Sequence, residues 1–439
     1  MESSLSQSTM QLVRPGQCVD LYYPDPQTAK KACFRTSQNT RYVQTFNNLS
    51  GGSNVFTIPP NNGVSDIILS LGLPIGGSSA WPTTTGLGVG RGWAYQLIKQ
   101  ISFRYGGSSQ YFMTGQQVMQ AVLSQAVDGT SRDALLSLGG SYTDAAGTAP
   151  ANFTTQQLGY VWLPLPHTIP SSVGKLPPIP SDLLTQQIQV TVELYPLSSI
   201  FSIGSTGSTA NVPASLAIGQ FALQQVLLEN QGDALARRVD MTSHALAFPV
   251  TFRQQEATIQ LNGGASITPS TAGLQTVSMT GFRSGEVKEI HAWLTADSAN
   301  TPAPAVSTAQ NPFAWYSPQN IQMLYAGEVY ARGDYGSMAL WNLVNGRMPQ
   351  QANDVLVSVG ATTSATASAD SWVVLPFGQS YAPETAHSMY VSGKPITNGI
   401  VNLQFTIPTN APVSTYTLRL SYIYNSVLSF SQGTCDYVF

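Results

Sequence analysis

Charged side chains are scarce in this chain of 439 residues. They make up 9% of it, against roughly a quarter in an ordinary soluble domain. The net charge of −3 lacks the basic excess of a nucleic-acid-binding surface, so we expect no direct sequence-specific contact with nucleic acid. Disorder is also excluded, because 42% of the residues are hydrophobic and 10% are aromatic. A surface built from Ser, Thr, Gln, Asn and Gly repels itself little and suits burial against other copies.

Cysteine and long apolar runs are scarce as well. Three cysteines (Cys18, Cys33 and Cys435) are too few for a disulfide framework and fit folding in a reducing compartment, with a Cys18–Cys33 bridge left open. No stretch approaches 18 consecutive apolar residues, so we expect no membrane-spanning helix. The N-terminal segment MESSLSQSTMQLVRPG lacks the apolar centre of a signal peptide.

The chain does contain a set of short sequence motifs that each occur twice, in the same order in both halves. Their offsets drift from about 212 to about 228 residues, as loop insertions and deletions would produce. The pairs are YVWLPLPHT (from residue 160) and WVVLPFGQS (from 372), ISFRYGG (101–107) and IQMLYAG (321–327), the helix-like segments 116–127 and 336–345, and the alternating runs 189–194 and 417–423. The repetition predicts two tandem copies of one domain.

Short alternating runs separated by Gly, Pro, Ser and Asn predict an all-β chain of antiparallel sandwiches or jelly rolls. The only convincing helix of the first half is 116–127. Expected strands in the first half are 42–47, 54–58, 66–73, 98–105, 159–164, 187–195 and 217–229. Those in the second half are 246–252, 257–261, 274–280, 289–295, 321–325, 355–359, 372–376, 400–407 and 416–429. The predicted organisation is an extended arm (1–30), a first domain (31–230), a linker (231–245) and a second domain (246–439).

The residues give little support for catalysis. The four histidines are scattered, and no cysteine pair has zinc spacing. Glu289 and His291 share one face of a strand and could begin a metal site, but a solvated sheet face is the simpler interpretation. The run GLGVGRG (86–92) imitates a phosphate loop without the following Gly-Lys-Ser/Thr, so we interpret it as a flexible turn. We therefore predict no catalytic, cofactor or metal site.

Two kinds of short motif are candidate recognition or modification sites. Arg332, Gly333 and Asp334 spell an integrin-binding tripeptide, although chance and a tight turn before a helix are the simpler explanation. Asn48 and Asn152 begin N-glycosylation patterns, and Asn152 lies in the long polar loop 139–157.

The order of these phrases carries a family resemblance. A strand ending in a glycine pair (ISFRYGG) leads into a short helix, then YVWLPLP, a Pro-rich link and QVTVELY, and the series recurs in the second half. The opening segment FRTSQNTRYVQTF (34–46), IQLNGG (259–264) and YTLRLSYIYNSVLSF (416–430) fit the same group. The chain resembles the double jelly-roll major capsid proteins of icosahedral DNA viruses, most of all those of the large eukaryotic DNA viruses and their smaller relatives.

The resemblance implies two eight-stranded jelly rolls, each with a short helix in a loop. Three chains would form a homotrimer, a pseudo-hexameric capsomer that tiles the icosahedral shell of a virion assembled inside the host cell. The implied partners are neighbouring capsomers, minor capsid or cement proteins, penton proteins and an internal membrane beneath the N-terminal arm. Interfaces of this size penalise unpaired charges, so we expect the 19 Lys and Arg residues mainly on the linker, barrel bases and capsomer edges.

Two other classes of protein stay open. A secreted carbohydrate-binding or adhesin protein with two β-sandwich modules would explain the strands and the Arg-Gly-Asp tripeptide. A jelly-roll glycoside hydrolase would need two facing carboxylates, and acidic residues are too sparse to nominate a pair.

Overall fold

The computed structural model describes most of both halves of the chain. The described residues are 37–59, 64–74, 87–89, 92–105, 109–123, 129–140, 157–163, 181, 184–203, 212–228, 246–296, 315–333, 372–377, 393–396, 400–409, 411, 413–431 and 433–438. The predicted arm (1–30), linker (231–245), second helix (336–345) and strand 355–359 lie outside them.

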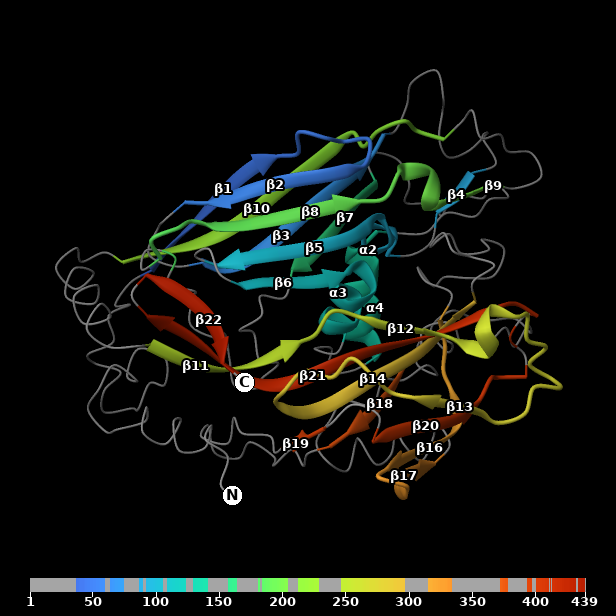
Figure 1. Cartoon of the computed structure of the whole chain (residues 1–439). Coiled ribbons are helices and arrows are strands. Elements are labelled where there is room, and N and C mark those ends of the chain that lie inside the picture. Colours follow the sequence, from blue (N-terminus) through green and yellow to red (C-terminus); the bar gives the residue numbers. More distant parts are fainter. Residues whose placement is uncertain are drawn as a thin grey trace.

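Two four-stranded antiparallel sheets form the first half (Figure 1). The β10 sheet has the order β1 (Ser37–Thr45), β10 (Ile218–Leu228), β3 (Val64–Leu73) and β7 (Gln157–Leu163). The β8 sheet has the order β2 (Gly52–Ile58), β8 (Ile188–Leu194), β5 (Ile98–Tyr105) and β6 (Ser109–Thr114). A short pair, β4 (Leu87–Val89) and β9 (Phe201–Ile203), is separate. Since β1, β2 and β3 alternate between the two sheets, the half is a jelly roll rather than a row of hairpins.

The second half repeats this arrangement. Its β21 sheet runs β11 (Leu246–Arg253), β21 (Tyr416–Ser431) and β14 (Glu286–Ala296), and β14 also pairs with β15 (Trp315–Tyr316), β18 (Val373–Pro376) and β19 (Lys394–Pro395). Two further strands, β12 (Ala257–Gln260) and β22 (Thr434–Val438), pair with β21. The β20 sheet runs β13 (Gln275–Ser278), β20 (Val401–Thr406), β16 (Gln319–Tyr325) and β17 (Glu328–Gly333). Every strand pair among the described residues joins strands of one half.

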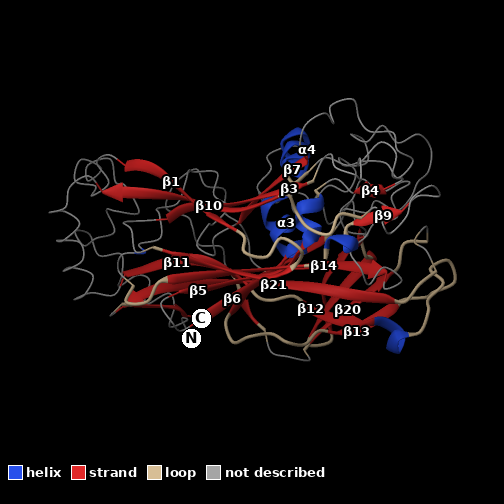
Figure 2. Ribbon diagram, turned by 90° about the horizontal axis from the view of Figure 1, so that it is seen from above, coloured by secondary structure: helices blue, strands red, loops and turns tan. Residues whose placement is uncertain are grey.

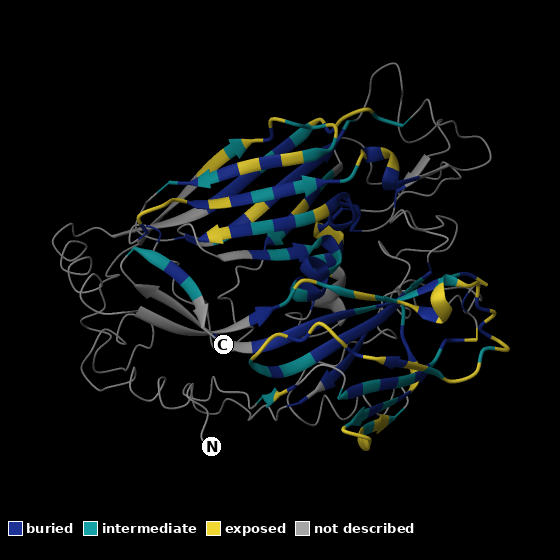
Figure 3. Ribbon diagram, in the orientation of Figure 1, coloured by how far each residue is buried: buried dark blue, intermediate teal, exposed yellow. Residues whose placement is uncertain are grey.

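Alternating side chains build both cores. Along β8 and β20 every second residue is buried, the pattern of a strand with one face toward the core (Figure 3). Phe56 of β2 stacks on Phe221 of β10 with ring centroids 4.4 Å apart, which joins the two sheets of the first half. The prediction of an all-β double jelly roll is therefore confirmed.

Helices lie between the two halves (Figures 1 and 2). They are α2 (Trp93–Leu97), α3 (Gly115–Leu123) and α4 (Gly129–Leu138), with single 3-10 turns η4 (Leu197–Ser199) and η6 (Leu261–Gly264) elsewhere. The predicted helix 116–127 corresponds to α3 as far as Leu123, and residues 124–127 lie outside the described residues, while α2 and α4 were not predicted. The flexible turn predicted at 86–92 is wrong at 87–89, because these residues pair with β9 as β4.

The topology corrects one of the repeated pairs. The strands β7 and β18 occupy equivalent places, as do β5 and β16, in agreement with the repeated phrases. The pairing of 189–194 with 417–423 is wrong, because β8 corresponds to β20, whereas β21 corresponds to β10. Alternation alone misled the comparison, since every half-buried strand shares that period.

Candidate functional site: the seam between the two halves

The first turn of α3 is fixed by reciprocal hydrogen bonds. The backbone N–H of Gln117 donates to Thr114 Oγ1 at 3.2 Å, and the backbone N–H of Thr114 donates to Gln117 Oε1 at 3.2 Å. This is a capping box, in which a hydroxyl and an amide three residues later satisfy exposed backbone donors at a helix start. The sequence TGQQ (114–117) carries that pattern and places the start of the helix at Gly115.

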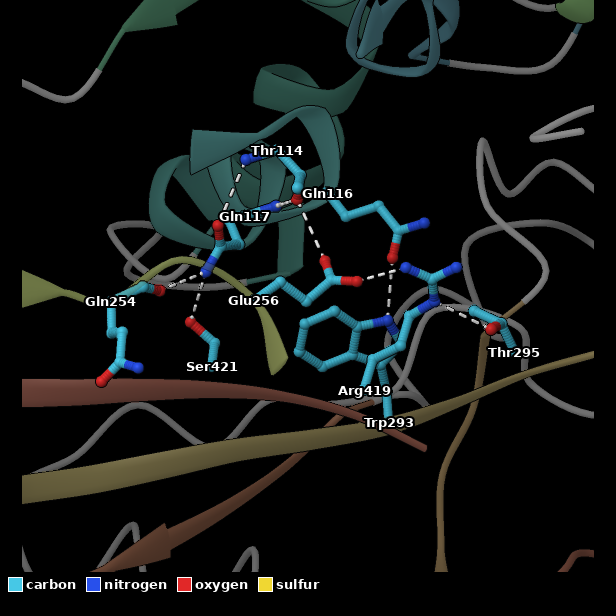
Figure 4. A network of polar contacts seen from close by, with 9 residues as sticks. All are labelled: Thr114, Gln116, Gln117, Gln254, Glu256, Trp293, Thr295, Arg419 and Ser421. Atoms are coloured by element: carbon cyan, nitrogen blue, oxygen red, sulfur yellow. Dashed lines mark hydrogen bonds and ion pairs between the residues drawn. The ribbon is translucent and has the colours of Figure 1, made fainter. Parts of the chain in front are cut away.

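The same turn binds the second half through its glutamines (Figure 4). Gln117 Nε2 donates to the backbone oxygen of Gln254 at 2.8 Å and to Ser421 Oγ at 2.9 Å. Gln116 Oε1 accepts from Trp293 Nε1 at 2.9 Å. The first turn of α3 thus reaches the segment after β11 and the strands β21 and β14. We call this contact region the seam.

An ion pair lies beside the glutamines (Figure 4). The buried carboxylate of Glu256 pairs with Arg419 of β21 and accepts a hydrogen bond from Thr114 Oγ1 at 3.1 Å. Arg419 Nε also donates to Thr295 Oγ1 at 2.9 Å. Both charges belong to the second half, and the hydrogen bond from Thr114 joins this buried pair to the first half.

Glu289 and His291 lie at the seam rather than on a solvated sheet face, which corrects the sequence interpretation. His291 is buried, and its Nε2 lies 3.2 Å from Glu289 Oε1. Its Nδ1 lies 3.5 Å from Nη1 of Arg253, which also donates to Gln120 Oε1 at 3.4 Å. Because a guanidinium only donates, Nδ1 accepts and the ring proton sits on Nε2, facing Glu289. The imidazole is a neutral bridge between a cation and a carboxylate.

We expect stability to fall on mild acidification because of this histidine. Burial lowers the pKa of His291 below its ordinary 6.5, and Arg253 and Lys288 add to the effect, while Glu289 opposes it. Between the folded pKa and about 6.5, His291 is protonated in the unfolded chain and neutral in the folded chain. The free energy of unfolding therefore decreases as the pH falls through about 6.5 toward the folded pKa. Each unit of pKa difference corresponds to about 1.4 kcal/mol. Urea titrations of wild type and His291→Gln at several pH values measure the difference, and identical pH profiles for the two would contradict this role.

Apolar contacts complete the seam. The ring of Tyr111 in β6 meets Phe252 of β11 edge-on, with centroids 5.3 Å apart. The strand β22 packs against β5 and β6 of the first half. Nearby, the backbone N–H of Thr185 donates to the Gly433 oxygen at 2.9 Å. The two jelly rolls are thus joined through both a core-like and a polar contact.

The recognition and modification candidates lie away from the seam or outside the described residues. Arg332 and Gly333 end β17 in a strand rather than a tight turn, and Asp334 lies outside the described residues. Asn48 is half-buried, and its Oδ1 accepts from Ser50 N–H at 3.2 Å and Ser50 Oγ at 2.9 Å. Asn152 lies outside the described part. Receptor binding and glycosylation stay predictions.

The described residues contain neither a candidate metal site nor a candidate membrane-spanning helix. No three His, Cys, Asp or Glu residues in the described ranges gather as a metal site would require. No helix in that part of the chain combines the length and apolar character needed to cross a membrane. Cys435 is buried, while Cys18 and Cys33 lie outside the described ranges.

The fold is similar to that of several solved viral structures. A chain of the PBCV-1 virus capsid has a TM-score of 0.59 and 12% identity, covering 92% of this chain and 98% of that one. A chain of the Sputnik virophage has a TM-score of 0.56 and 11% identity, covering 92% and 88%. The mavirus major capsid protein has a TM-score of 0.52 and 11% identity, covering 92% and 90%.

No protein-family model and no curated protein sequence matches the chain. The structural similarity extends over both jelly rolls and nearly the whole length of each solved chain. The resemblance inferred from the repeated phrases is therefore confirmed at the level of fold: the chain has the double jelly-roll fold of viral major capsid proteins.

Proposed function

We propose that this chain is the major capsid protein of a DNA virus and forms the shell of its virion. The observation that carries the proposal is the match over both jelly rolls to capsid chains of almost the same extent. The seam supports it too, because two barrels held by buried polar groups make a rigid building block. Two independent binding modules, as in an adhesin, would not need such a contact.

The proposed assembly is a homotrimer that acts as a pseudo-hexameric capsomer. Two equivalent barrels per chain give six per trimer, and closed rotational symmetry is the usual arrangement of identical subunits. The low charge of the chain favours broad contacts between copies. Proposed partners are neighbouring capsomers, minor capsid or cement proteins and penton proteins. The arm 1–30 is proposed to face an internal membrane, with assembly inside the host cell. No catalytic role or cofactor is part of this proposal.

The expected result for the purified full-length chain is a particle of about 140 kDa, three times the 46.8 kDa subunit, that persists on dilution. Light scattering coupled to size-exclusion chromatography measures the mass. Electron micrographs should show compact particles with hexagonal outlines, since six similar barrels surround one axis. A monomer at every concentration, or affinity for glycans in a glycan array, would overturn the capsid proposal in favour of the adhesin class.

A further inference from the structure

One outer sheet face is covered in the second half of the chain. Across the β21 sheet, Ser421, His291 and Val374 form one row, because Ser421 pairs with His291 and His291 pairs with Val374. Their side chains point away from the barrel interior, since the alternate residues Ile290 and Leu420 belong to the core. All three residues of the row are buried, and Ser421 accepts the hydrogen bond from Gln117 of α3. The first half therefore covers this face.

The equivalent face of the first half is exposed at its large side chains among the described residues, although the small Ala222 between them is buried. Across the β10 sheet, Ala222, Ile68 and Trp162 form the corresponding row, because Ala222 pairs with Ile68 and Ile68 pairs with Trp162. Ile67 and Leu69 fill the barrel, so Ile68 points outward. Ile68 is 38% exposed, whereas His291 at the equivalent position is 2% exposed.

The neighbouring position shows the same contrast. The phrases YVWLPL and WVVLPF place Tyr160 of β7 where Trp372 stands before β18. Tyr160 is 41% exposed and Trp372 is fully buried. The exposed Val43 of β1 extends the first-half row, since it pairs with Ala222. We call the outward surface of Val43, Ile68, Tyr160 and Trp162 the open face.

None of the four residues of the open face is charged, and Arg41 of β1 and Asp66 of β3 lie in the next row of the sheet, which runs through Gln224. The carboxylate of Asp66 accepts a hydrogen bond from Trp162 Nε1 at 3.3 Å. A β-sheet surface with four large apolar side chains is costly to leave in water and cheap to cover. The comparable surface of the second half is covered by protein from another jelly roll, so the natural cover here is also a jelly roll.

The chain offers a matching surface at its other end. In the seam, the first half contributes β6 and the helix that follows it. The strand at the place of β6 in the second half is β17, an edge strand of the β20 sheet. Its Val329 and Tyr330 are exposed large hydrophobic side chains. Within the described residues, one such pair of surfaces meets inside the chain, and the corresponding pair (the open face and the β17 side) is exposed, although Tyr330 also stacks on Phe377.

We propose that the open face binds the β17 side of a second copy of this chain, repeating between chains the contact that the seam makes within one. The inference rests on the proposed capsid function and specifies its interface. The two surfaces differ, so the contact is head-to-tail and closes only as a ring. Three copies complete a ring of six jelly rolls. Arg332 of the integrin-type tripeptide lies on β17, so this interface would place the tripeptide beside a neighbouring chain.

The first test places a charge on the open face. Ile68→Glu should leave the fold intact, because the side chain already meets solvent, but should raise the dissociation constant of the trimer by about 100-fold or more, since the carboxylate would be buried without a partner. Val55→Glu is the matched control: Val55 is also exposed and β-branched, but it points outward from β2 on the opposite sheet of the same barrel. Circular dichroism checks folding, and analytical ultracentrifugation measures mass.

The second test exploits the head-to-tail geometry. Val329→Glu damages the β17 side and should also give monomers. A mixture of Ile68→Glu and Val329→Glu keeps one good surface of each kind, so it should form a dimer of about 94 kDa, twice the subunit mass. A symmetric contact of one face with itself would give a different outcome, because the Val329→Glu chains would then still associate alone.

The outcomes separate this inference from the capsid proposal. If wild type is trimeric and Ile68→Glu is equally trimeric, the interface is wrong and the capsid proposal stands. If Val55→Glu dissociates as readily as Ile68→Glu, the open face has no special role, and the inference also fails. If wild type never associates, the capsid proposal itself fails.

Discussion

Replacing Glu256 by alanine should lower the free energy of unfolding by about 3–5 kcal/mol, the cost of removing one partner from a buried ion pair. Glu256 is buried where the first half meets the second, and its carboxylate holds both Arg419 and the hydroxyl of Thr114. Alanine leaves the guanidinium without its counter-charge and Thr114 without its acceptor. Since Thr114 caps α3, the first turn of that helix and its glutamine contacts should loosen together. Urea denaturation of the full-length chain measures the change.

A matched control comes from another ion pair. Lys99 Nζ lies 2.6 Å from Glu193 Oε1, but both side chains are well exposed. Exposed pairs contribute little because water and salt screen them. Glu193→Ala should therefore leave the urea midpoint almost unchanged. Equal effects of the two substitutions would show that burial at the seam gives the Glu256 pair no special weight.

The sequence predicted the fold better than it predicted the seam. Barrel strands are visible because burial of one face imposes a two-residue period, and β8, with its IQVTVEL run, shows it fully. The Leu-Pro phrases of β7 and β18 added a non-periodic marker, so this pair located the duplication correctly. Edge strands such as β6, β17 and β22 were not predicted. The residue types in such strands depend on packing against neighbours outside the strand's own sheet, and this weakens the two-residue period.

The seam could not be predicted because it joins residues far apart in the chain. Gln117 meets Ser421 across 304 positions, and no local pattern encodes such a contact. His291 was expected to face solvent because its polar neighbour Glu289 suggested a wet face. In the structure, His291 is instead buried between Glu289 and Arg253, which are hydrogen-bond partners of its two ring nitrogens. The capping box TGQQ is a local sequence pattern that was not used in the prediction. It marks where the helix starts and not what the helix binds.

Two arginines are exceptions to the expected distribution of charge, which stays a prediction for the other basic residues. Low charge content suggested that contacts between jelly rolls avoid ions, and that basic residues lie on the linker, bases and edges. Arg253 and Arg419 instead lie in the seam, each held by acceptors from several elements. Buried charges are tolerated where every donor finds a partner, and they then define one docking geometry. By contrast, the open face proposed for association between chains is mainly apolar, so covering it removes apolar surface from water without burying unpaired charges.

The second large effect is expected at Gly115, the first residue of α3. A Cβ placed there would lie 2.2 Å from the backbone oxygen of Tyr95 and 2.4 Å from that of Ile98. Neither atom can rotate away, because both belong to the backbone where α2 continues into β5. Gly115→Ala should therefore displace the start of α3 and cost about 3 kcal/mol, at the upper end of overpacking effects. Thermal unfolding and the urea midpoint measure the loss.

The control for this substitution is Gly273→Ala. A Cβ at Gly273 meets no atom within 4 Å, so alanine there should be neutral or slightly stabilising. Because α3 carries Gln116, Gln117 and Gln120 into the seam, the damage at Gly115 should extend beyond the helix. Hydrogen exchange should quicken at β14 and β21 of the other half, which the substitution does not touch. Faster exchange confined to α2 and α3 would mean that the two jelly rolls stay docked without this helix, and that the seam depends mainly on the contacts of β6 and β22.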